Sequence, residues 1–116
     1  MPLIQVETSC EVDGAKKESL AGTLSKLAAE GIGKPEQYVM ACVYDKVTMT
    51  MSGAAGPTAL VTIKSIGGLG KSVNQVLAQH VSALLQKELA IPPSRVYLTF
   101  TELTAVNWAW NGKTFG

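Results

Sequence analysis

The feature that most constrains the fold is an internal duplication. A shift of the sequence by 58 residues aligns Pro35 with Pro93, Leu27 with Leu85, Glu30 with Glu88 and Val39 with Tyr97. Each half contains a strand pattern, a helical pattern and a second strand pattern, in that order. Two copies are too few for a repeat array. The chain is therefore predicted to fold as a duplicated β-α-β unit, with halves at about residues 2–56 and 57–104.

In the first half the hydrophobic period changes along the chain. Pro2–Thr8 alternates between apolar and polar residues, which predicts a strand. From residue 16 to residue 30 apolar side chains recur at spacings of three and four, which is typical of an amphipathic helix. Gly31 and Gly33 are expected to end that helix. After Lys34, the apolar run of residues 38–44 predicts a second strand.

The second half repeats this order. Residues 59–66 form an apolar strand pattern, residues 73–85 a helical one, Pro92 and Pro93 break the chain, and residues 96–101 read as a fourth strand. Right-handed crossovers place both helices on one face of the sheet. The expected fold is α/β (α+β in some schemes), with a four-stranded mixed sheet and two helices on one face.

The other face of this sheet has no helix to cover it. Only 16% of the residues are charged, against about 25% in typical soluble domains, which favours burial against a partner subunit. A bare apolar sheet face would be covered if three or more copies packed their sheets together. The chain is expected to be one domain, 1–116, with an arm at 105–116. Residues 47–51 and 107–115 are read as short strands or arms for subunit contacts.

Composition excludes several classes of function. The formal charge is +1 with both signs interspersed, so no basic stripe suits a nucleic acid. No apolar run is long enough to span a membrane, and the first residues lack a signal-peptide pattern. We therefore expect a cytoplasmic protein without membrane or nucleic-acid partners.

Cys10 and Cys42 indicate neither a disulfide scaffold nor a zinc site, and are expected to be small buried residues. With His80 as the one histidine, neither Ser-His-Asp catalysis nor a multi-histidine metal site is expected.

Candidate chemical groups each have an ordinary structural explanation. The glycine-rich stretch 65–72 follows a strand and opens a helix, but it lacks the spacing of nucleotide-binding loops. It predicts a tight turn whose N–H groups could hold one carboxylate. His80 falls among apolar helix positions and is expected to be packed or to lie at the boundary of the core, without a chemical role. Lys34 after a helix end complements the helix dipole. The aromatic residues Tyr38, Tyr97, Trp108, Trp110 and Phe115 suit subunit packing or the wall of an apolar pocket.

Pro2 becomes chemically interesting only if Met1 is removed. The initiator methionine is normally trimmed before a small second residue such as proline. Trimming would convert the Pro2 nitrogen from an amide into a secondary amine at the start of a strand. Burial or a nearby cation could then destabilise its protonated form and make it a base.

Together these residues resemble the macrophage migration inhibitory factor family of the tautomerase superfamily. The likeness covers essentially the whole chain, and its order and spacing are more specific than any one fragment. The matching pieces are Met1-Pro2, Gly33-Lys34-Pro35-x-x-Tyr38, Ser65-Ile66-Gly67, Arg95-Val96-Tyr97 and Asn107-x-x-Trp110-Asn111-x-x-Thr114-Phe115.

The resemblance implies a homotrimer with its sheets facing inward and three active sites at subunit boundaries. It implies keto-enol tautomerisation of phenylpyruvate-like α-keto acids, and possible action on dopachrome-type substrates, without a cofactor. By the same resemblance Pro2 is the catalytic base, and Lys34 with the Ser65-Ile66 backbone binds the carboxylate. A neighbouring subunit would lend Tyr97, and Thr99 would stand at the far end of the aryl pocket. The aryl pocket would be lined by Leu3, Tyr38, Trp108, Trp110 and Phe115.

Three departures from the family pattern are visible. The CxxC segment of vertebrate members, linked to a proposed thiol-redox activity, is replaced by residues 58–61, Thr-Ala-Leu-Val, so that activity is rejected. Thr99 stands where the family has an asparagine, which affects recognition of an aryl hydroxyl. Trp108 replaces a small apolar residue, which would narrow the pocket. The alternative function is a cytokine-like, receptor-binding protein with vestigial catalysis, since non-classical secretion leaves no signal peptide.

Overall fold

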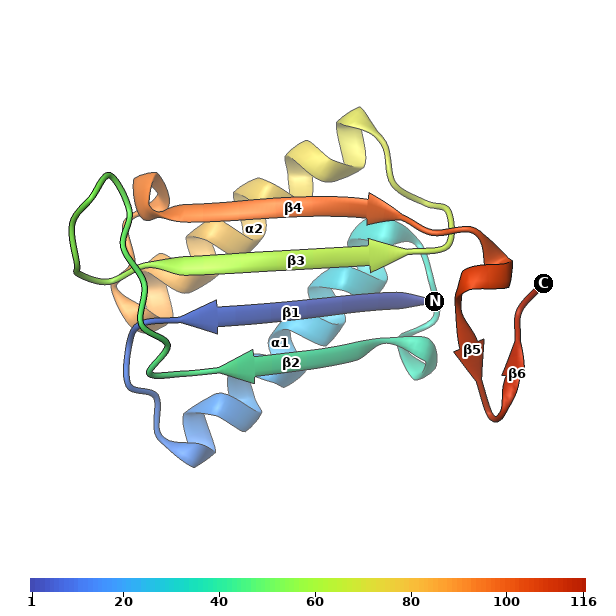
Figure 1. Cartoon of the computed structure of the whole chain (residues 1–116), viewed down its shortest axis with the longest axis horizontal. Coiled ribbons are helices and arrows are strands. Elements are labelled where there is room, and N and C mark those ends of the chain that lie inside the picture. Colours follow the sequence, from blue (N-terminus) through green and yellow to red (C-terminus); the bar gives the residue numbers. More distant parts are fainter.

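A computed structural model describes all residues, Met1–Gly116, and confirms the predicted architecture (Figure 1). One four-stranded sheet has the order β2-β1-β3-β4, and α1 and α2 pack against one of its faces. The strands are β1 (Pro2–Thr8), β2 (Met40–Tyr44), β3 (Ala59–Ser65) and β4 (Val96–Glu102), and the helices are α1 (Gly14–Ile32) and α2 (Lys71–Leu89). β1 pairs with β2 and β3 with β4 in parallel, whereas the central β1–β3 pair is antiparallel. The sheet is therefore mixed.

The duplication is visible in the element order. β1 and β3, α1 and α2, and the short 3₁₀ turns η1 (Glu36–Tyr38) and η2 (Pro93–Arg95) each begin 57 residues apart. This spacing is one residue shorter than the sequence shift, so Pro35 corresponds to Pro92, and these two residues precede the turns. Because η1 occupies residues 36–38, β2 begins at Met40, later than the apolar run predicted.

The helices are also longer than their apolar stripes. α1 runs through Gly31 and ends at Gly33, whose φ of 77° is the left-handed conformation that glycine adopts readily. Gly31 instead serves the contact between helices, because a Cβ there would come within 2.6 Å of Leu77 on α2. None of the helices is long and apolar enough to cross a membrane. His80 is exposed on α2 and is not packed in the core.

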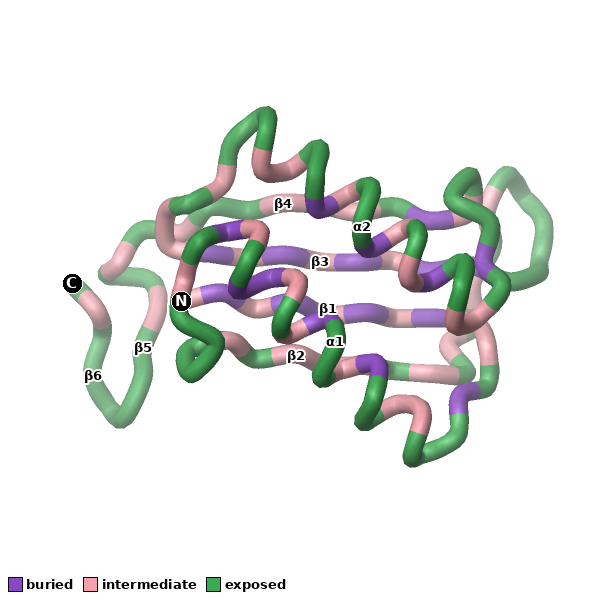
Figure 2. Tube along the Cα trace, turned by 180° about the vertical axis from the view of Figure 1, so that it is seen from behind, coloured by how far each residue is buried: buried purple, intermediate pink, exposed green.

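The hydrophobic core lies between the helices and the sheet (Figure 2). β1 and β3 each show strict alternation of buried and half-exposed residues, as expected of central strands with one covered face. Cys10 packs against the core while remaining partly exposed, and Cys42 is also partly exposed, so neither is the fully buried residue expected. The core residues are Ile4, Val6, Leu20, Leu24, Ala28, Ile32, Ala59, Val61, Ile63, Leu77, Val81, Leu85, Ile91 and Val96.

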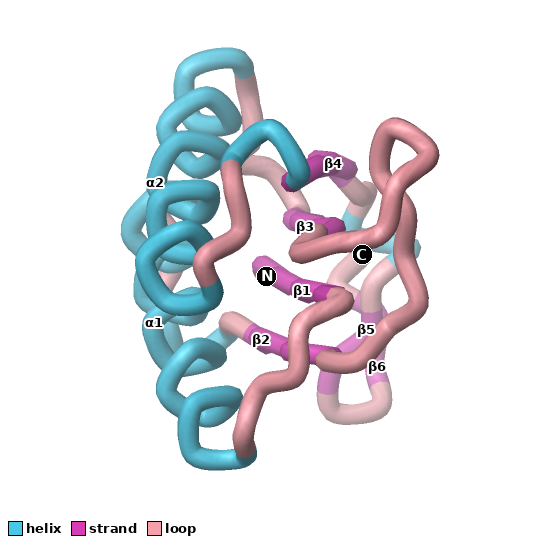
Figure 3. The backbone as a smooth tube through the Cα atoms, turned by 90° about the vertical axis from the view of Figure 1, so that its left-hand side faces the viewer, coloured by secondary structure: helices cyan, strands magenta, loops and turns pink.

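The opposite face of the sheet carries no helix (Figure 3). We call it the open face; the strand registers place on it Leu3, Gln5, Glu7, Met40, Cys42, Tyr44, Leu60, Thr62, Lys64, Tyr97, Thr99 and Thr101. Half of these residues are polar, so the expected bare apolar face is in fact mixed. A sheet with an antiparallel centre can expose such a face to water. Burial alone therefore does not demand a partner here.

Of the two segments outside the repeat, only the C-terminal one forms the expected short strands. Residues 47–51 form no strand, and Met51 makes only an isolated bridge to Ala54. The C-terminal arm does form a small hairpin of β5 (Ala109–Trp110) and β6 (Lys113–Thr114), preceded by the 3₁₀ turn η3 (Ala105–Asn107). The hairpin lies beyond the start of β1 (Figure 1).

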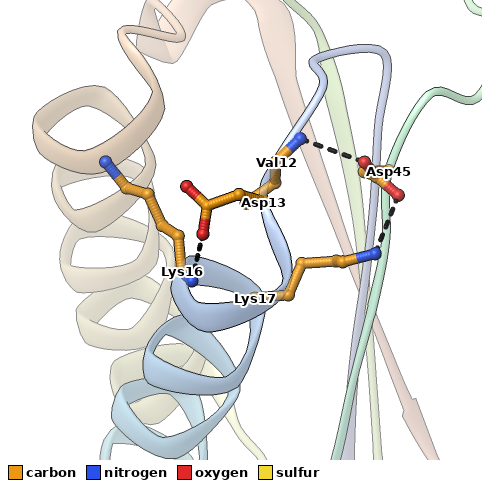
Figure 4. Close-up of polar contacts among 5 residues, drawn as sticks. All are labelled: Val12, Asp13, Lys16, Lys17 and Asp45. Carbon is orange, nitrogen blue, oxygen red and sulfur yellow. Dashed lines mark hydrogen bonds and ion pairs between the residues drawn. The ribbon is translucent and has the colours of Figure 1, made fainter.

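A polar cluster fixes the start of α1 against the end of β2 (Figure 4). Asp45 accepts a hydrogen bond from the Val12 N–H at 3.0 Å and one from Lys17 Nζ at 3.3 Å. Asp13 caps the helix by accepting from the Lys16 N–H. The Val12 hydrogen bond does most to hold the pKa of Asp45 below its usual range; burial opposes it, and Lys17 lowers the pKa further.

This cluster predicts an acid-dependent contribution to stability. Because the pKa of Asp45 is lower in the folded chain, its stabilisation is present above the unfolded value of about 3.9 and is lost as the pH falls through the folded value. Asp45→Asn should therefore lower the urea midpoint near pH 6, with the difference from the unmodified protein shrinking toward pH 2.5. The control is Glu18→Gln, which removes the charge of an exposed carboxylate on α1. Parallel pH profiles for the Asp45→Asn and unmodified proteins would contradict the prediction.

Candidate active site

A cavity of about 450 Å³ lies at the end of the sheet where β1 begins and β3 ends. This volume is in the usual range of small-molecule sites. Ten of its fourteen lining residues are hydrophobic, and none is Asp or Glu. They are Met1, Pro2, Leu3, Gln37, Tyr38, Val39, Met40, Lys64, Leu103, Asn107, Trp108, Ala109, Trp110 and Phe115.

Pro2 occupies the inner part of this site. It is the first residue of β1, its side chain is fully buried, and its register partner on the antiparallel strand β3 is Ser65. Proline has no N–H to donate to the ladder, and the first residue of a strand is one of the few positions in a sheet that tolerate this loss. The register places the Pro2 nitrogen beside the end of β3, where Ile66 begins the glycine-rich turn.

Lys34 lies beside the same turn because of how α1 ends. After Gly33 turns the chain, the Lys34 N–H donates to the carbonyl of Ala29 at 3.0 Å. The side chain then packs across two glycines: Lys34 Nζ lies 3.9 Å from where a Cβ would stand on Gly67, and its Cε 3.4 Å from that of Gly68. Both glycines have positive φ, 73° and 82°. The turn therefore leaves room for a cation that a bulkier sequence would displace.

The amino terminus lies in the cavity, and its surroundings change the pKa of its amine. Burial, and then the positive charge of Lys34, lower the pKa of the Met1 amino group below its ordinary value of 8.0. Both causes disfavour the protonated amine. An amine at this end of β1 is thus held toward its neutral, basic form.

The aromatic wall comes from two distant parts of the chain. Tyr38, at the end of η1, contacts Trp110 on β5 edge to face, with ring centroids 6.4 Å apart and an interplanar angle of 89°. This arrangement is a preferred one for aromatic pairs. Across the hairpin, the Phe115 N–H donates to the carbonyl of Trp108 at 3.0 Å. The arm thereby closes one side of the cavity.

The structure brings together most of the residues singled out from the sequence. Pro2, Leu3, Tyr38, Trp108, Trp110 and Phe115 line the cavity, and Lys34, Ser65 and Ile66 lie next to it without lining it. Ser65 is buried, and its hydroxyl donates to the carbonyl of Gly67. This bond stabilises the turn.

Tyr97 and Thr99 are not brought to the cavity within one chain. Through Leu60, the register aligns Tyr97 with Glu7, five residues along β1 from Pro2. At about 3.3 Å per residue this separation is about 17 Å along the sheet. Thr99 aligns with Gln5 through Thr62, three residues from Pro2. Both side chains are exposed on the open face.

Some lining residues were missed from the sequence, notably Lys64, Gln37, Met40, Leu103 and Asn107. The signal that could have found Lys64 is the alternation of β3, since Lys64 shares the open face with its register partner Leu3. That signal requires the register, which the sequence alone did not supply. Leu103 is held in place by its N–H, which donates to the carbonyl of Ser65 at 2.9 Å.

Comparison with known proteins identifies the family. The family model described as macrophage migration inhibitory factor (MIF) matches residues 1–116. The chain belongs to the MIF family. Its structure is similar to the crystal structure of the MIF homologue from Prochlorococcus marinus, with a TM-score of 0.93 and 40% identity over 98% of this chain and 99% of the other.

Further MIF relatives agree with this assignment. The MIF-like protein of Entamoeba histolytica has a TM-score of 0.93 and 31% identity, with 98% of each chain covered. The MIF of Meriones unguiculatus is 35% identical over 99% of each chain. Membership of the MIF family, within the tautomerase superfamily, supports a tautomerase or cytokine-like function.

Proposed function

We propose that this MIF-family chain is a keto-enol tautomerase of phenylpyruvate-like α-keto acids. The observation that carries the proposal is the amino terminus, which lies in a largely hydrophobic cavity where burial and Lys34 lower the pKa of its amine. In the active form Met1 is removed, and the Pro2 nitrogen becomes the terminal amine. Pro2 is more deeply buried than Met1, and burial disfavours the protonated form of an amine.

The proposed reaction is a proton transfer. The neutral Pro2 amine takes a proton from the carbon next to the substrate carbonyl, and the C–H electron pair forms a C=C bond. The protonated Pro2 amine then gives its proton to the carbonyl oxygen, which becomes the enol hydroxyl, and the amine is neutral again. A secondary amine normally holds its proton at neutral pH, so a lowered pKa is what allows it to act as a base at pH 7.

Lys34 and the turn after β3 are proposed to bind the substrate carboxylate. The Lys34 ammonium supplies the charge, and the Ile66 N–H, next to the register partner of Pro2, supplies a backbone donor. Charge-assisted hydrogen bonds of this kind are stronger than neutral ones. The carboxylate is then held beside Pro2, and the aryl ring lies among Leu3, Tyr38, Trp108, Trp110 and Phe115.

A homotrimer is proposed on the placement of Tyr97. If Tyr97 contributes to a site, the distance along the sheet requires that the site belong to another chain. Packing three open faces together would cover the exposed Met40, Tyr44 and Tyr97. The trimer would then complete three sites at its subunit boundaries.

Enolase and ketonase assays on phenylpyruvate, with the dopachrome assay beside them, test the proposed function. A preparation shown by intact mass to lack Met1 should convert phenylpyruvate well above the buffer rate. No conversion in either direction would contradict the proposal. Binding to a cell-surface receptor without catalysis would instead favour the cytokine-like alternative.

Shared sites predict complementation between inactive chains. Pro2→Gly chains and Tyr97→Phe chains should each have low activity as homotrimers. When they are mixed under exchange conditions, some sites combine an intact Pro2 with an intact Tyr97 and activity should reappear. Sedimentation should give a mass of about three chains at micromolar concentration. A mass of one chain, or no recovery after demonstrated exchange, would contradict the shared site.

Thr99 predicts a substrate preference. If a neighbour's Thr99 lies at the far end of the aryl pocket, its short hydroxyl pairs poorly with a para-hydroxyl on the ring. An unsatisfied buried group costs about 1 to 3 kcal/mol. The protein should favour phenylpyruvate over its 4-hydroxyphenyl analogue, and Thr99→Asn should shrink that preference in kcat/KM. Equal values for both substrates, unchanged in the variant, would show that Thr99 does not contact the ring substituent.

A further inference from the structure

Lys64 is the one charged side chain that lines the cavity. It lies on β3, one residue before the partner of Pro2, and faces the open side of the sheet with Leu3 opposite it. Its side chain is half-buried. A lysine near the end of a strand, lining a largely hydrophobic cavity, is not explained by packing of the core, which lies on the other face.

No acidic partner accounts for Lys64 within the chain. The two ion pairs are Lys16–Glu88 and Lys17–Asp45, and neither involves the cavity. The neighbour of Lys64 on β4 is Thr101, and the polar residues that share the cavity, Gln37 and Asn107, are neutral. A cation partly removed from water without a counter-charge is unfavourable. A bound anion would supply that charge.

One lysine is enough to balance the charge of one substrate carboxylate, and in the proposed reaction that lysine is Lys34. Lys34 lies against the glycine turn, next to the amine whose pKa it lowers, whereas Lys64 lies on the open face of the sheet. Lys64 in the cavity and Lys34 at the turn beside it are therefore two cations on different elements, and no residue that lines the cavity is acidic. A substrate with a single carboxylate would use only one of them.

We propose that Lys64 is a specificity-determining residue that binds a second anionic group of the substrate. The preferred substrate class is then an enolisable α-keto acid with two negative charges, one held by Lys34 and the other by Lys64. This inference rests on the proposed function and narrows it. The second group is a carboxylate on the aryl ring or on a short chain in its place.

The test compares mono- and dianionic ligands in Lys64 variants. The kcat/KM is measured for phenylpyruvate and for its 3-carboxy and 4-carboxy ring derivatives, and the ratio of each diacid to phenylpyruvate is taken. Binding of unreactive phenylacetate and 4-carboxyphenylacetate is measured in parallel by tryptophan fluorescence. The variants are Lys64→Met and Lys64→Gln, with Lys64→Arg as the charge-conserving change and Lys26→Met, exposed on α1, as the control.

The expected result is a ratio above one for at least one diacid in the unmodified protein. Lys64→Met and Lys64→Gln should each lower that ratio about tenfold, as expected for the loss of a charge-assisted contact. Lys64→Arg should retain most of it, and Lys26→Met all of it. A ratio insensitive to Lys64, or one that falls equally in Lys26→Met, would overturn the inference.

Failure of the inference differs from failure of the proposed function. If no substrate is turned over but 4-carboxyphenylacetate binds more tightly than phenylacetate in a Lys64-dependent way, the anion site stands and the tautomerase proposal falls. If phenylpyruvate is turned over but no diacid is preferred, the tautomerase proposal stands and the second anion site falls. A Lys64→Met variant that loses trimer mass while retaining the diacid ratio would assign Lys64 to the subunit interface, which also overturns the inference.

Discussion

Replacing Pro2 by glycine is expected to lower kcat/KM for phenylpyruvate by about 10²-fold or more, the lower range for loss of a positioned general base. Glycine keeps a terminal amine but loses the ring that is buried at the start of β1. The amine is then free to rotate and is less desolvated. The measurement is the initial rate of enolisation with protein that lacks Met1.

The effect on stability should be much smaller than the effect on turnover. Removing the buried ring costs packing of about 1 to 3 kcal/mol, as for most damaging single substitutions. The strand itself has further support, since β1 pairs with β3 from Pro2 to Thr8 and with β2 from Leu3 to Glu7. Thermal unfolding followed by circular dichroism should therefore show a folded variant. Loss of folding in step with loss of activity would leave Pro2 a structural residue and contradict the catalytic role.

A blocked amine provides the matched control. An N-terminally extended chain keeps the Pro2 ring in place but makes its nitrogen an amide, which cannot accept the proton. Such a chain should lose activity at least as completely as Pro2→Gly while keeping the buried ring. Intact-mass measurement establishes which form is present. Full activity with Met1 wholly retained would contradict the mechanism.

The layers of the fold were predictable because the two hydrophobic periods are well separated in each half. The alternation in Pro2–Thr8 matches β1 residue for residue, since a central strand with one covered face must alternate. β2 was predicted too early because the apolar run at Tyr38 also contains a 3₁₀ turn, η1. Hydrophobicity cannot separate a turn that contributes to a cavity wall from the strand that follows it.

The composition of the open face was less predictable. Low overall charge favoured an apolar face, yet Gln5, Thr62 and Thr99 lie on it in neighbouring strands. Which residues face outward depends on the register between strands from the two halves. A shift of one residue would exchange the two faces. The sequence predicts the alternation within each strand but not this pairing.

The candidate site could be predicted only because short, separated fragments of the sequence resemble the MIF family. Tyr38 and Trp110 are 72 residues apart in sequence and meet edge to face. Their contact follows from the path of the C-terminal arm, which no local pattern determines. The glycines at 67 and 68 were recognised as a turn, but their role in accommodating Lys34 depends on the end of α1. Tyr97 lies far along the sheet from Pro2 of its own chain, so the proposal that it contributes to a site depends on a second chain.

Replacing Lys34 by alanine is expected to weaken binding of phenylpyruvate by about 10- to 100-fold. A hydrogen bond to a charged group contributes about 1.5 to 3 kcal/mol, and each 1.4 kcal/mol corresponds to a factor of ten. Lys34 forms no ion pair in the chain, so no acidic side chain is left unpaired by its removal. The fold should be retained, and the loss should appear in KM and in the Kd of an unreactive aryl acid.

The same substitution should also move the pH profile of kcat/KM, and the direction is fixed by the sign of the charge. Lys34 lowers the pKa of the terminal amine because two positive charges disfavour each other. Without Lys34 the amine keeps its proton to higher pH, so the limb of the profile on which the base loses its proton should move toward alkaline pH. Lys34→Arg conserves the charge and should leave that limb near its original place.

Binding of the carboxylate and lowering of the amine pKa are two roles of Lys34 that can be measured independently. Burial is the larger cause of the lowered pKa of the terminal amine, and the charge of Lys34 is the smaller one. Alanine removes the smaller, electrostatic cause and also opens the turn to water, so the shift should be upward but should not restore the pKa of a free amine. Lys34→Gln removes the charge while filling more of the space. If Lys34→Gln and Lys34→Ala shift the pH profile equally, the shift is due to the lost charge. If the shift is smaller in Lys34→Gln, part of the shift in Lys34→Ala is due to entry of water. An unchanged profile with weakened binding would leave Lys34 only the role of holding the carboxylate, and desolvation alone would then have to keep the Pro2 amine neutral.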